Sequence, residues 1–304
     1  MTGRLKNESG FALILTLVVT ALMVAVVIEM IHQVYVDTSL SRGFRDGQQA
    51  SILAESGVTG AAALLNVGLA NQTYTSLSDR WATPLKLEDE AGSLEITISE
   101  ESSKININDL LIQPKTLEAL QRLGTRLQLP GEIWSAVADW VDSDDLPRSG
   151  GAESSYYSTL KPPYKARNNK LLTLTELSLV RGVTPEVLGK LRPYLTTFSE
   201  EANSPLSRIN INTAPKEVLA ALDELVDDRM AEQIIEERRL LPFKSPGELS
   251  RVPGMDKIIN NLTARITTKG NLFRITSVAR VKDSVRTVEA VVRLSGEVLS
   301  WQEY

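Results

Sequence analysis

Carboxylates gather in one short stretch of this chain, and they are the residues best suited to chemistry. They are Asp139, Asp142, Asp144, Asp145 and Glu153. Hard oxygen ligands at such close spacing suit calcium, which takes about six to eight of them. Counted from Asp142, an EF-hand loop would use Asp144 and Glu153, but Leu146 and Pro147 stand at positions five and six and break that motif. The stretch therefore predicts either a calcium site of another kind or a solvated acidic loop with an Asp capping a helix.

Residues for other kinds of chemistry are scarce. The chain has no cysteine, which excludes a disulfide framework, a thiolate metal site and a cysteine nucleophile. Its single histidine, His32, has no neighbour with which it would form a nucleophile–base pair. The net charge of −5 predicts no strongly basic surface. The sequence therefore predicts that the chain is not an enzyme.

An internal repeat surrounds the acidic stretch. Ser103–Asn108 (SKININ) recurs as Ser207–Asn212 (SRININ), and a helix is predicted soon after each copy. Both helices begin at a proline, which suits a first helical turn. Asn108 and Asn212 precede these helices, where a side-chain oxygen can cap free backbone N–H groups. Two related helical units are therefore predicted, at about 104–200 and 203–268.

The second unit also resembles the helix-hairpin-helix units that hold a DNA backbone. The resemblance rests on Ile209–Ala214, Ile234–Arg239, Phe243 and the turn Val252–Gly254. Phosphate binding at such a turn needs glycine N–H groups and surrounding Lys or Arg. Here Asp256 stands where a second glycine is common, and residues 203–268 hold nine Lys or Arg against ten Asp or Glu. No nucleic-acid partner is therefore expected, and a membrane-anchored helix-hairpin-helix nucleic-acid-binding protein is the alternative.

The elements that must position these units are one long helix and three strands. No proline interrupts positions 1–83, and small or apolar residues recur every three or four positions, which predicts a helix from about Phe11 to about Leu65. Apolar and alternating runs predict strands at 94–98, 272–279 and 286–294. Because the first strand lies far upstream of its partners, residues 104–268 are predicted to be inserted. The predicted fold class is α+β, with a large all-α inserted domain of two helix-hairpin-helix or SAM-like repeats.

A membrane segment lies near the start of the chain. Eighteen apolar or small residues, Phe11–Ile28, follow the polar stretch Met1–Gly10. At about 1.5 Å per residue, this run matches the hydrocarbon thickness of a bilayer. In a secretory signal peptide the small residue follows the apolar core, whereas Gly10 precedes it, so cleavage there would leave the helix on the mature chain. Arg4 and Lys6 predict a cytoplasmic N-terminus. An uncleaved single-pass anchor is the alternative.

The junction Ser9-Gly10-Phe11 resembles the class III leader of type IV pilins and type II secretion pseudopilins. The resemblance implies that a prepilin peptidase cuts after Gly10 and methylates the new amino group of Phe11. Most family members carry Glu at the fifth mature position, where this chain has Leu15. That departure and the double insert resemble the K-type minor pseudopilins of the type II secretion system. These proteins cap the pseudopilus tip and help to initiate its assembly for protein export across the outer membrane. A type IV pilus minor pilin is the alternative.

This resemblance implies a domain order, a location and a set of partners. The order is a leader at 1–10, a membrane helix at 11–28, and a pilin-like domain at 29–103 and 269–304 around the insertion. The location is the bacterial inner membrane, with a single pass and the bulk in the periplasm. The implied partners are I-type and J-type minor pseudopilins, other pseudopilins and the prepilin peptidase. Calcium is implied on Asp142, Asp144 and Glu153 first, and on Asp139 and Asp145 second. The residues expected to let partner helices approach are Ala50, Ala54, Gly57 and Ala61.

Overall fold

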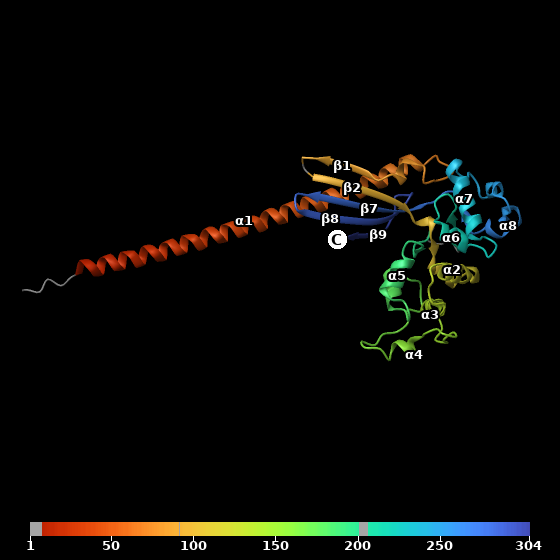
Figure 1. Cartoon of the computed structure of the whole chain (residues 1–304), viewed down its shortest axis with the longest axis horizontal. Helices are drawn as coiled ribbons and strands as arrows, with labels where there is room; N and C mark the ends of the chain where they lie inside the picture. The colour runs from red at the N-terminus through yellow and green to blue at the C-terminus, as the bar shows by residue number, and fades with distance from the viewer. Residues whose placement is uncertain (1–7, 91, 201–205) are drawn as a thin grey trace, which may run out of the picture.

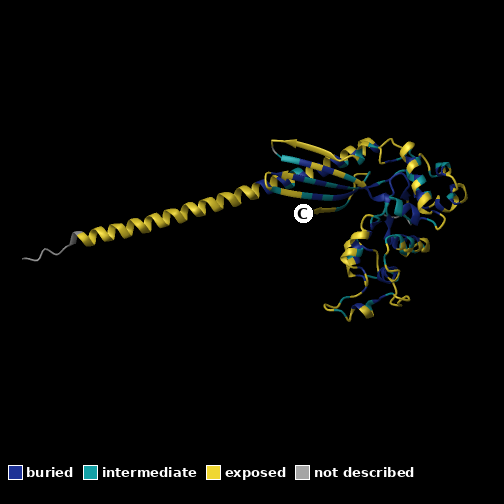
Figure 2. Ribbon diagram, viewed as in Figure 1, coloured by how far each residue is buried: buried dark blue, intermediate teal, exposed yellow. Residues whose placement is uncertain are grey.

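The long N-terminal helix dominates the shape of the molecule. The computed structural model describes residues 8–90, 92–200 and 206–304. Helix α1 runs from Glu8 to Leu69 and projects far beyond the folded body (Figure 1). Within the described residues, α1 is the helix long and apolar enough to cross a membrane, and its most apolar window has a mean hydropathy of 3.0. The chain buries none of that window (Figure 2). The predicted long helix is confirmed, and it ends at Leu69 rather than near Leu65.

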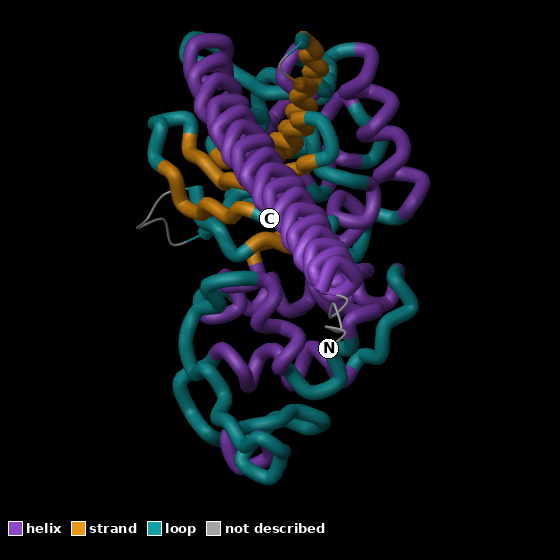
Figure 3. The backbone as a smooth tube through the Cα atoms, turned by 90° about the vertical axis from the view of Figure 1, so that its left-hand side faces the viewer, coloured by secondary structure: helices purple, strands orange, loops and turns teal. Residues whose placement is uncertain are grey.

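An antiparallel sheet packs along the second half of α1 (Figure 3). Its strands are β1 (Leu85–Asp89), β2 (Gly92–Glu100), β7 (Leu272–Val281), β8 (Ser284–Arg293) and β9 (Val298–Glu303), in that spatial order. The short 3-10 helix η1 (Arg80–Ala82) precedes β1. The three predicted strands are confirmed as β2, β7 and β8. Because β2 and β7 are paired neighbours, with Glu100 opposite Phe273, the chain leaves the sheet and returns to it at the same end.

The small residues of α1 form the face that contacts this sheet. Ala50 and Ala54 are fully buried, Ala61 is 4% exposed and Gly57 is buried as well. A Cβ on Gly57 would lie 2.3 Å from Oγ of Ser277. The expectation that Ala50, Ala54, Gly57 and Ala61 contact partner helices is therefore corrected. These positions are small because α1 lies close to its own sheet, which covers them.

Gly57 and Gly60 provide a matched test of this packing. Both lie inside α1, but a Cβ on Gly60 would have no neighbour within 4 Å. We expect Gly57→Leu to lower the free energy of unfolding by about 1–3 kcal/mol, because the larger side chain forces α1 away from the sheet. Gly60→Leu should raise it by up to about 1 kcal/mol through helix propensity. Urea unfolding of both variants measures the difference, and equal effects would contradict this packing.

The insertion folds into two successive helical units, which follow the 3-10 helix η2 (Glu101–Ser103). The first comprises β3 (Ile105–Asn106), η3 (Ile107–Leu111), α2 (Pro114–Arg126), α3 (Glu132–Val141), α4 (Ser154–Tyr157), η4 (Leu174–Leu179), α5 (Pro185–Leu191) and β4 (Leu195–Thr196). The second comprises β5 (Ile209–Asn210), α6 (Lys216–Ala221), α7 (Asp228–Leu240), η5 (Pro246–Arg251), η6 (Met255–Lys257), α8 (Ile259–Leu262) and β6 (Ile266–Thr267). A short parallel bridge closes each unit, β3 with β4 and β5 with β6.

The repeated asparagines hold the two units in the same way. The Asn108 side chain accepts a hydrogen bond from the N–H of Leu171 and donates one to the carbonyl of the same residue. Asn212 makes the same pair of hydrogen bonds with Phe243. Neither side chain caps α2 or α6, so that expectation is corrected. Both side chains instead join segments that lie far apart in the sequence.

The two units differ most in the length of the segment that precedes the residue bound by the asparagine. In the second unit only residues 241–242 separate the end of α7 from Phe243. In the first unit residues 142–170 separate the end of α3 from Leu171. Nearly all of the acidic stretch lies in this longer segment. The two units share one hydrophobic core, which gives the segment a rigid base.

Candidate functional site

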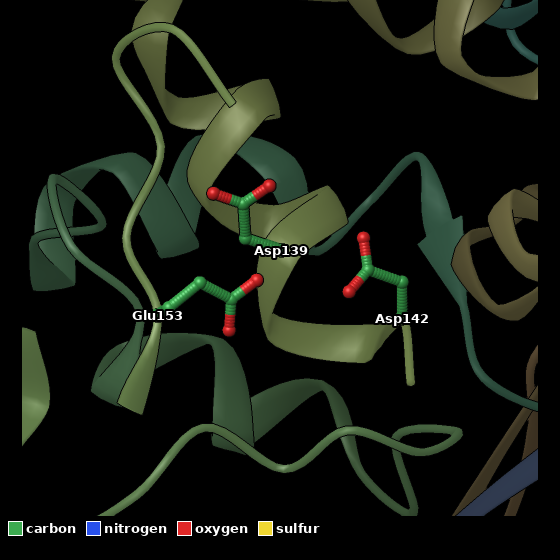
Figure 4. A group of neighbouring side chains, drawn as sticks. All are labelled: Asp139, Asp142 and Glu153. Atoms are coloured by element: carbon green, nitrogen blue, oxygen red, sulfur yellow. The ribbon is translucent and has the colours of Figure 1, made fainter. Parts of the chain in front are cut away.

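Three of the predicted carboxylates meet at the end of α3. Asp139 lies in the last turn of the helix, Asp142 directly follows it, and Glu153 comes from the returning loop just before α4. One oxygen of each lies within 4.8 Å of the others. Figure 4 shows the carboxyl groups of Asp142 and Glu153 turned toward each other beside Asp139. The segment 142–170 thus brings Glu153 back to the helix that carries Asp139.

Burial makes these charges costly to leave unpaired. Asp139 is 0% exposed and Glu153 is 1% exposed. Both carboxyl oxygens of Glu153, and Oδ1 of Asp142, are buried without a hydrogen-bond partner from the described chain. Buried polar atoms are almost always paired, because an unpaired one loses its hydration without replacement. Three such oxygens in one cluster therefore fit a ligand set for a hard cation.

Arg148 and Gly151 shape the cluster, and the sequence reasoning missed both. Nη1 of Arg148 lies 2.7 Å from Oδ1 of Asp139 and also contacts Oδ2 of Asp142. The backbone N–H of Arg148 donates to Oδ2 of Asp139 at 3.0 Å. A Cβ on Gly151 would lie 1.9 Å from that same oxygen, so only glycine lets the loop approach α3 this closely. The run Arg148-Ser149-Gly150-Gly151 was the available signal, since it places a cation and a tight turn inside an acidic stretch.

The electrostatics of the cluster indicate excess negative charge. Burial raises the pKa of Glu153 to about 7, and the charges of Asp139, Asp142, Asp145 and Asp144 add to this effect. Hydrogen bonds to Asp142 and Asp139 raise the pKa of Arg148 above its ordinary value. The guanidinium pairs with two of the three carboxyl groups, which leaves an excess of acidic groups in the cluster. A divalent cation would carry more positive charge into the cluster than the guanidinium does.

Asp144 and Asp145 do not join this cluster. Both are exposed. Oδ1 of Asp144 accepts a hydrogen bond from the N–H of Leu146 at 2.8 Å, and Oδ1 of Asp145 accepts one from Nδ2 of Asn168 at 3.4 Å. The chain turns outward after Asp142, while the last turn of α3 is buried. The structure therefore brings Asp139, Asp142 and Glu153 together and leaves the other two predicted ligands at the surface.

Aromatic side chains anchor the loop that carries Glu153. Tyr157 is fully buried, and its ring lies 4.9 Å from that of Trp140 and 5.2 Å from that of Tyr164. Its hydroxyl accepts a hydrogen bond from the N–H of Arg181, which follows η4. The loop is therefore packed against both α3 and the second half of its unit. This packing fixes the position of Glu153 relative to Asp139.

The predicted processing residues lie on the uncovered part of α1. Gly10 is exposed, Phe11 is 72% exposed and Leu15 is 53% exposed. Arg4 and Lys6 lie outside the described residues. The fifth position after Gly10 therefore presents an apolar side chain, with no charge, at the surface of the helix.

Comparison with known proteins gives consistent matches over most of the chain. Two family models, both described as type II secretion system protein K, match residues 103–200 and 209–269. Type II secretion system protein K of Pseudomonas aeruginosa is 30% identical over 81% of this chain and 77% of its own length. The protein of the same description from Aeromonas hydrophila is 25% identical over 94% of this chain and 93% of its own.

A solved structure shares the fold. It is a chain of the GspK-GspI-GspJ complex from the type 2 secretion system of enterotoxigenic Escherichia coli. The TM-score is 0.71 at 22% identity, over 87% of this chain and 99% of that one. The likeness supports the predicted α+β class, with a long helix packed on an antiparallel sheet in a pilin-like manner and a helical insertion.

Proposed function

The chain belongs to the type II secretion system protein K family of minor pseudopilins, and we propose that it caps the tip of a pseudopilus and helps to initiate its assembly. Proteins of this family are structural and not enzymatic, which agrees with the prediction from the sequence. Membership assigns the chain to type II secretion in preference to a type IV pilus or to nucleic-acid binding. The observation that carries the tip proposal is the placement of a bulky insertion at the end of the molecule opposite the uncovered apolar part of α1 (Figure 1).

The tip position follows from two physical features. The apolar part of α1 leaves lipid only when equivalent helices of neighbouring subunits replace it, since its own chain covers none of that window. The second helical unit lies beyond the end of the sheet that is away from the free part of α1, and the first unit lies to one side of that end (Figure 1). They would obstruct another subunit that stacks above. Leu15 supplies no charge to recruit one.

The proposed partners are the I-type and J-type minor pseudopilins, since the E. coli structure with the same fold is a GspK-GspI-GspJ complex. The small residues of α1 are covered by its own sheet, so partners must use another surface. The free stretch of α1 on the N-terminal side of the sheet carries exposed apolar side chains, among them Leu40 at 67% and Phe44 at 72% exposure. We propose this stretch as the contact with partner helices.

The proposed metal is calcium, bound by Asp139, Asp142 and Glu153. These residues fit a hard cation because three of their buried oxygens lack a partner and Gly151 leaves room beside Asp139. Bound calcium would supply a cross-link between the end of α3 and the returning loop. Its role here is structural, because it would hold residues 142–170 on the first helical unit.

The proposed function is tested by expressing the full chain with a prepilin peptidase and with I-type and J-type subunits. We expect an intact mass for a chain that starts at methylated Phe11, because Gly10 is the small residue at the junction. We also expect the mature chain to co-purify with both subunits from detergent. A Leu40→Ser/Phe44→Ser variant should be cleaved normally but lose the co-purification, since both side chains are exposed and support no core.

Two results would contradict parts of this proposal separately. A chain that still starts at Met1 would make α1 a fixed anchor and remove the filament pathway. A mature chain that co-purifies with neither subunit would support the proposed cleavage but contradict the proposed partners.

A further inference from the structure

We propose that the guanidinium of Arg148 is an internal cation that occupies the carboxylate cluster in the metal-free chain and leaves it when a divalent cation binds. Arg148 is then a residue that sets the affinity of the site, and not only a surface ion pair. This inference rests on the proposed calcium site. It concerns what the chain itself places among Asp139, Asp142 and Glu153 when no metal is bound.

The six carboxyl oxygens of the cluster divide into two sets. Three of them, both oxygens of Glu153 and Oδ1 of Asp142, have no hydrogen-bond partner. The other three are all held by Arg148. Its Nη1 donates hydrogen bonds to Oδ1 of Asp139 and Oδ2 of Asp142, and its backbone N–H donates one to Oδ2 of Asp139. Both oxygens of Asp139 are thus held by Arg148, so a cation that takes Oδ1 of Asp139 as a ligand must displace Nη1 from it. Waters and backbone carbonyls can supply the rest of the roughly six to eight oxygens that calcium takes.

The two parts of Arg148 have separable roles. The backbone N–H holds Asp139 from the loop and stays in place whatever the side chain does. The side chain is 46% exposed, whereas the side chain of Asp139 is 0% exposed and that of Asp142 is 17% exposed. The guanidinium can therefore swing into solvent without opening a cavity in the core. The acidic groups cannot move away in the same way.

Repulsion between positive charges also favours replacement of the guanidinium by the metal over binding of both in the cluster. In the described part of the chain, Arg148 is the cation that forms ion pairs with Asp139 and Asp142. A divalent cation seated among the same carboxylates would stand next to the guanidinium, and two positive charges in contact with the same oxygens repel each other. The metal and the guanidinium are therefore competitors for one position.

The test compares calcium binding by the full chain and by Arg148→Gln, both in detergent after treatment with a chelator. Isothermal titration with calcium chloride measures the affinity, and thermal unfolding measures the metal-free stability. We expect Arg148→Gln to bind calcium at least about tenfold more tightly, because no ion pair must be broken first. We also expect it to melt at a lower temperature without metal, because the carboxylates lose their counter-charge.

Arg167→Gln is the matched control. Arg167 lies in the same loop, is also partly exposed, and pairs with Glu176 rather than with the cluster. The same loss of one positive charge should therefore leave the calcium affinity nearly unchanged. An equal gain in both variants would overturn the inference, because it would show a general charge effect. Unchanged or weaker binding by Arg148→Gln alone would overturn it as well.

The outcomes separate this inference from the proposed calcium site. Binding by Arg148→Gln but not by the wild type would support the internal cation and reject calcium as a resident ion. Binding by the wild type with no gain in the variant would keep calcium and reject the competition. No binding by either chain would reject both.

Discussion

Calcium should raise the melting temperature of this chain by about 8–16 °C at a free concentration of about 1,000 times its Kd, and Glu153→Gln should abolish the rise. A ligand at that excess adds about 4 kcal/mol to stability, and about 2–4 °C of melting temperature accompanies each kcal/mol in a folded unit of about 150–250 residues. Among the proposed ligands, Glu153 would gain the most from a bound cation, since both of its oxygens are buried and unpaired. Differential scanning calorimetry with calcium and with a chelator measures the shift.

The same substitution should have the opposite effect on the chelator-treated chain. Glu153 is buried beside Asp139 and Asp142, and it has no hydrogen bond to lose. Replacing it by the neutral isostere removes a repelled charge and should raise the melting temperature of the metal-free protein. Asp144→Ala is the control, because that side chain is exposed and bonds only to the N–H of Leu146 in the described structure. If Asp144→Ala abolished the calcium effect and Glu153→Gln did not, the ligand set would be wrong.

The sequence was sufficient to point to the acidic stretch but not to show which of its carboxylates lie together. Five carboxylates in one stretch predicted either a cation site or a solvated acidic loop, and the family resemblance placed Asp144 before Asp139. The choice depends instead on where α3 ends and how the loop returns. Asp139 is in the last buried turn, and Glu153 reaches it because Tyr157 packs on Trp140. Such contacts between distant residues leave no periodic signal in a single sequence.

The two repeats could be recognised from local sequence identity, but the role of their asparagines could not. The identical ININ segments predicted two related units. The expected helix caps are in fact clamps on Leu171 and Phe243, because each asparagine offers both a donor and an acceptor to one distant backbone residue. Proximity in sequence favoured capping, but the fold brings another segment closer.

Burial explains which parts of the sheet and helix were predictable. Strands β2, β7 and β8 lie inside the sheet, and their buried residues produce readable apolar patterns. Every residue of β1 is exposed, and β9 is mostly exposed, so neither edge strand buries an apolar face against the core. The spacing of Ala50, Ala54, Gly57 and Ala61 correctly indicated a contact face on α1. It could not tell the chain's own sheet from a partner helix.

Glu100 lies at the junction between this sheet and the second helical unit, and it was not singled out from the sequence. It ends β2 and is 3% exposed. Oε1 accepts a hydrogen bond from Nδ2 of Asn210 at 2.8 Å, and Oε2 accepts one from Oγ1 of Thr75 at 3.1 Å. Both partners are neutral. Burial raises the pKa of Glu100 to about 7, although these hydrogen bonds oppose the shift.

A pH-dependent loss of stability should follow from this raised pKa. Between the ordinary value of 4.5 and the native value of about 7, the native chain keeps a proton that the unfolded chain releases. Stability from this group is therefore fully present below about pH 4.5 and falls as the pH rises toward 7. The difference of the two values corresponds to about 3 kcal/mol. Glu100→Gln should remove this dependence, so its stability relative to the wild type should rise by about 3 kcal/mol between about pH 5 and pH 8.

Glu101, the next residue, is the control, because its pKa is shifted in the opposite direction. Burial alone would raise the pKa of Glu101, but Lys104 at 2.6 Å and Arg274 at 2.8 Å lower it below its ordinary value. Glu101→Gln breaks a buried charge network and should cost about 3–5 kcal/mol, nearly constant over the same pH range. Urea unfolding in a chelating buffer at several pH values gives the stability of each variant relative to the wild type. The titration of Glu153 is common to all three chains and cancels in these differences. A flat curve for Glu100→Gln would show that Glu100 is ionised throughout and that its two hydrogen bonds suffice to hold the charge.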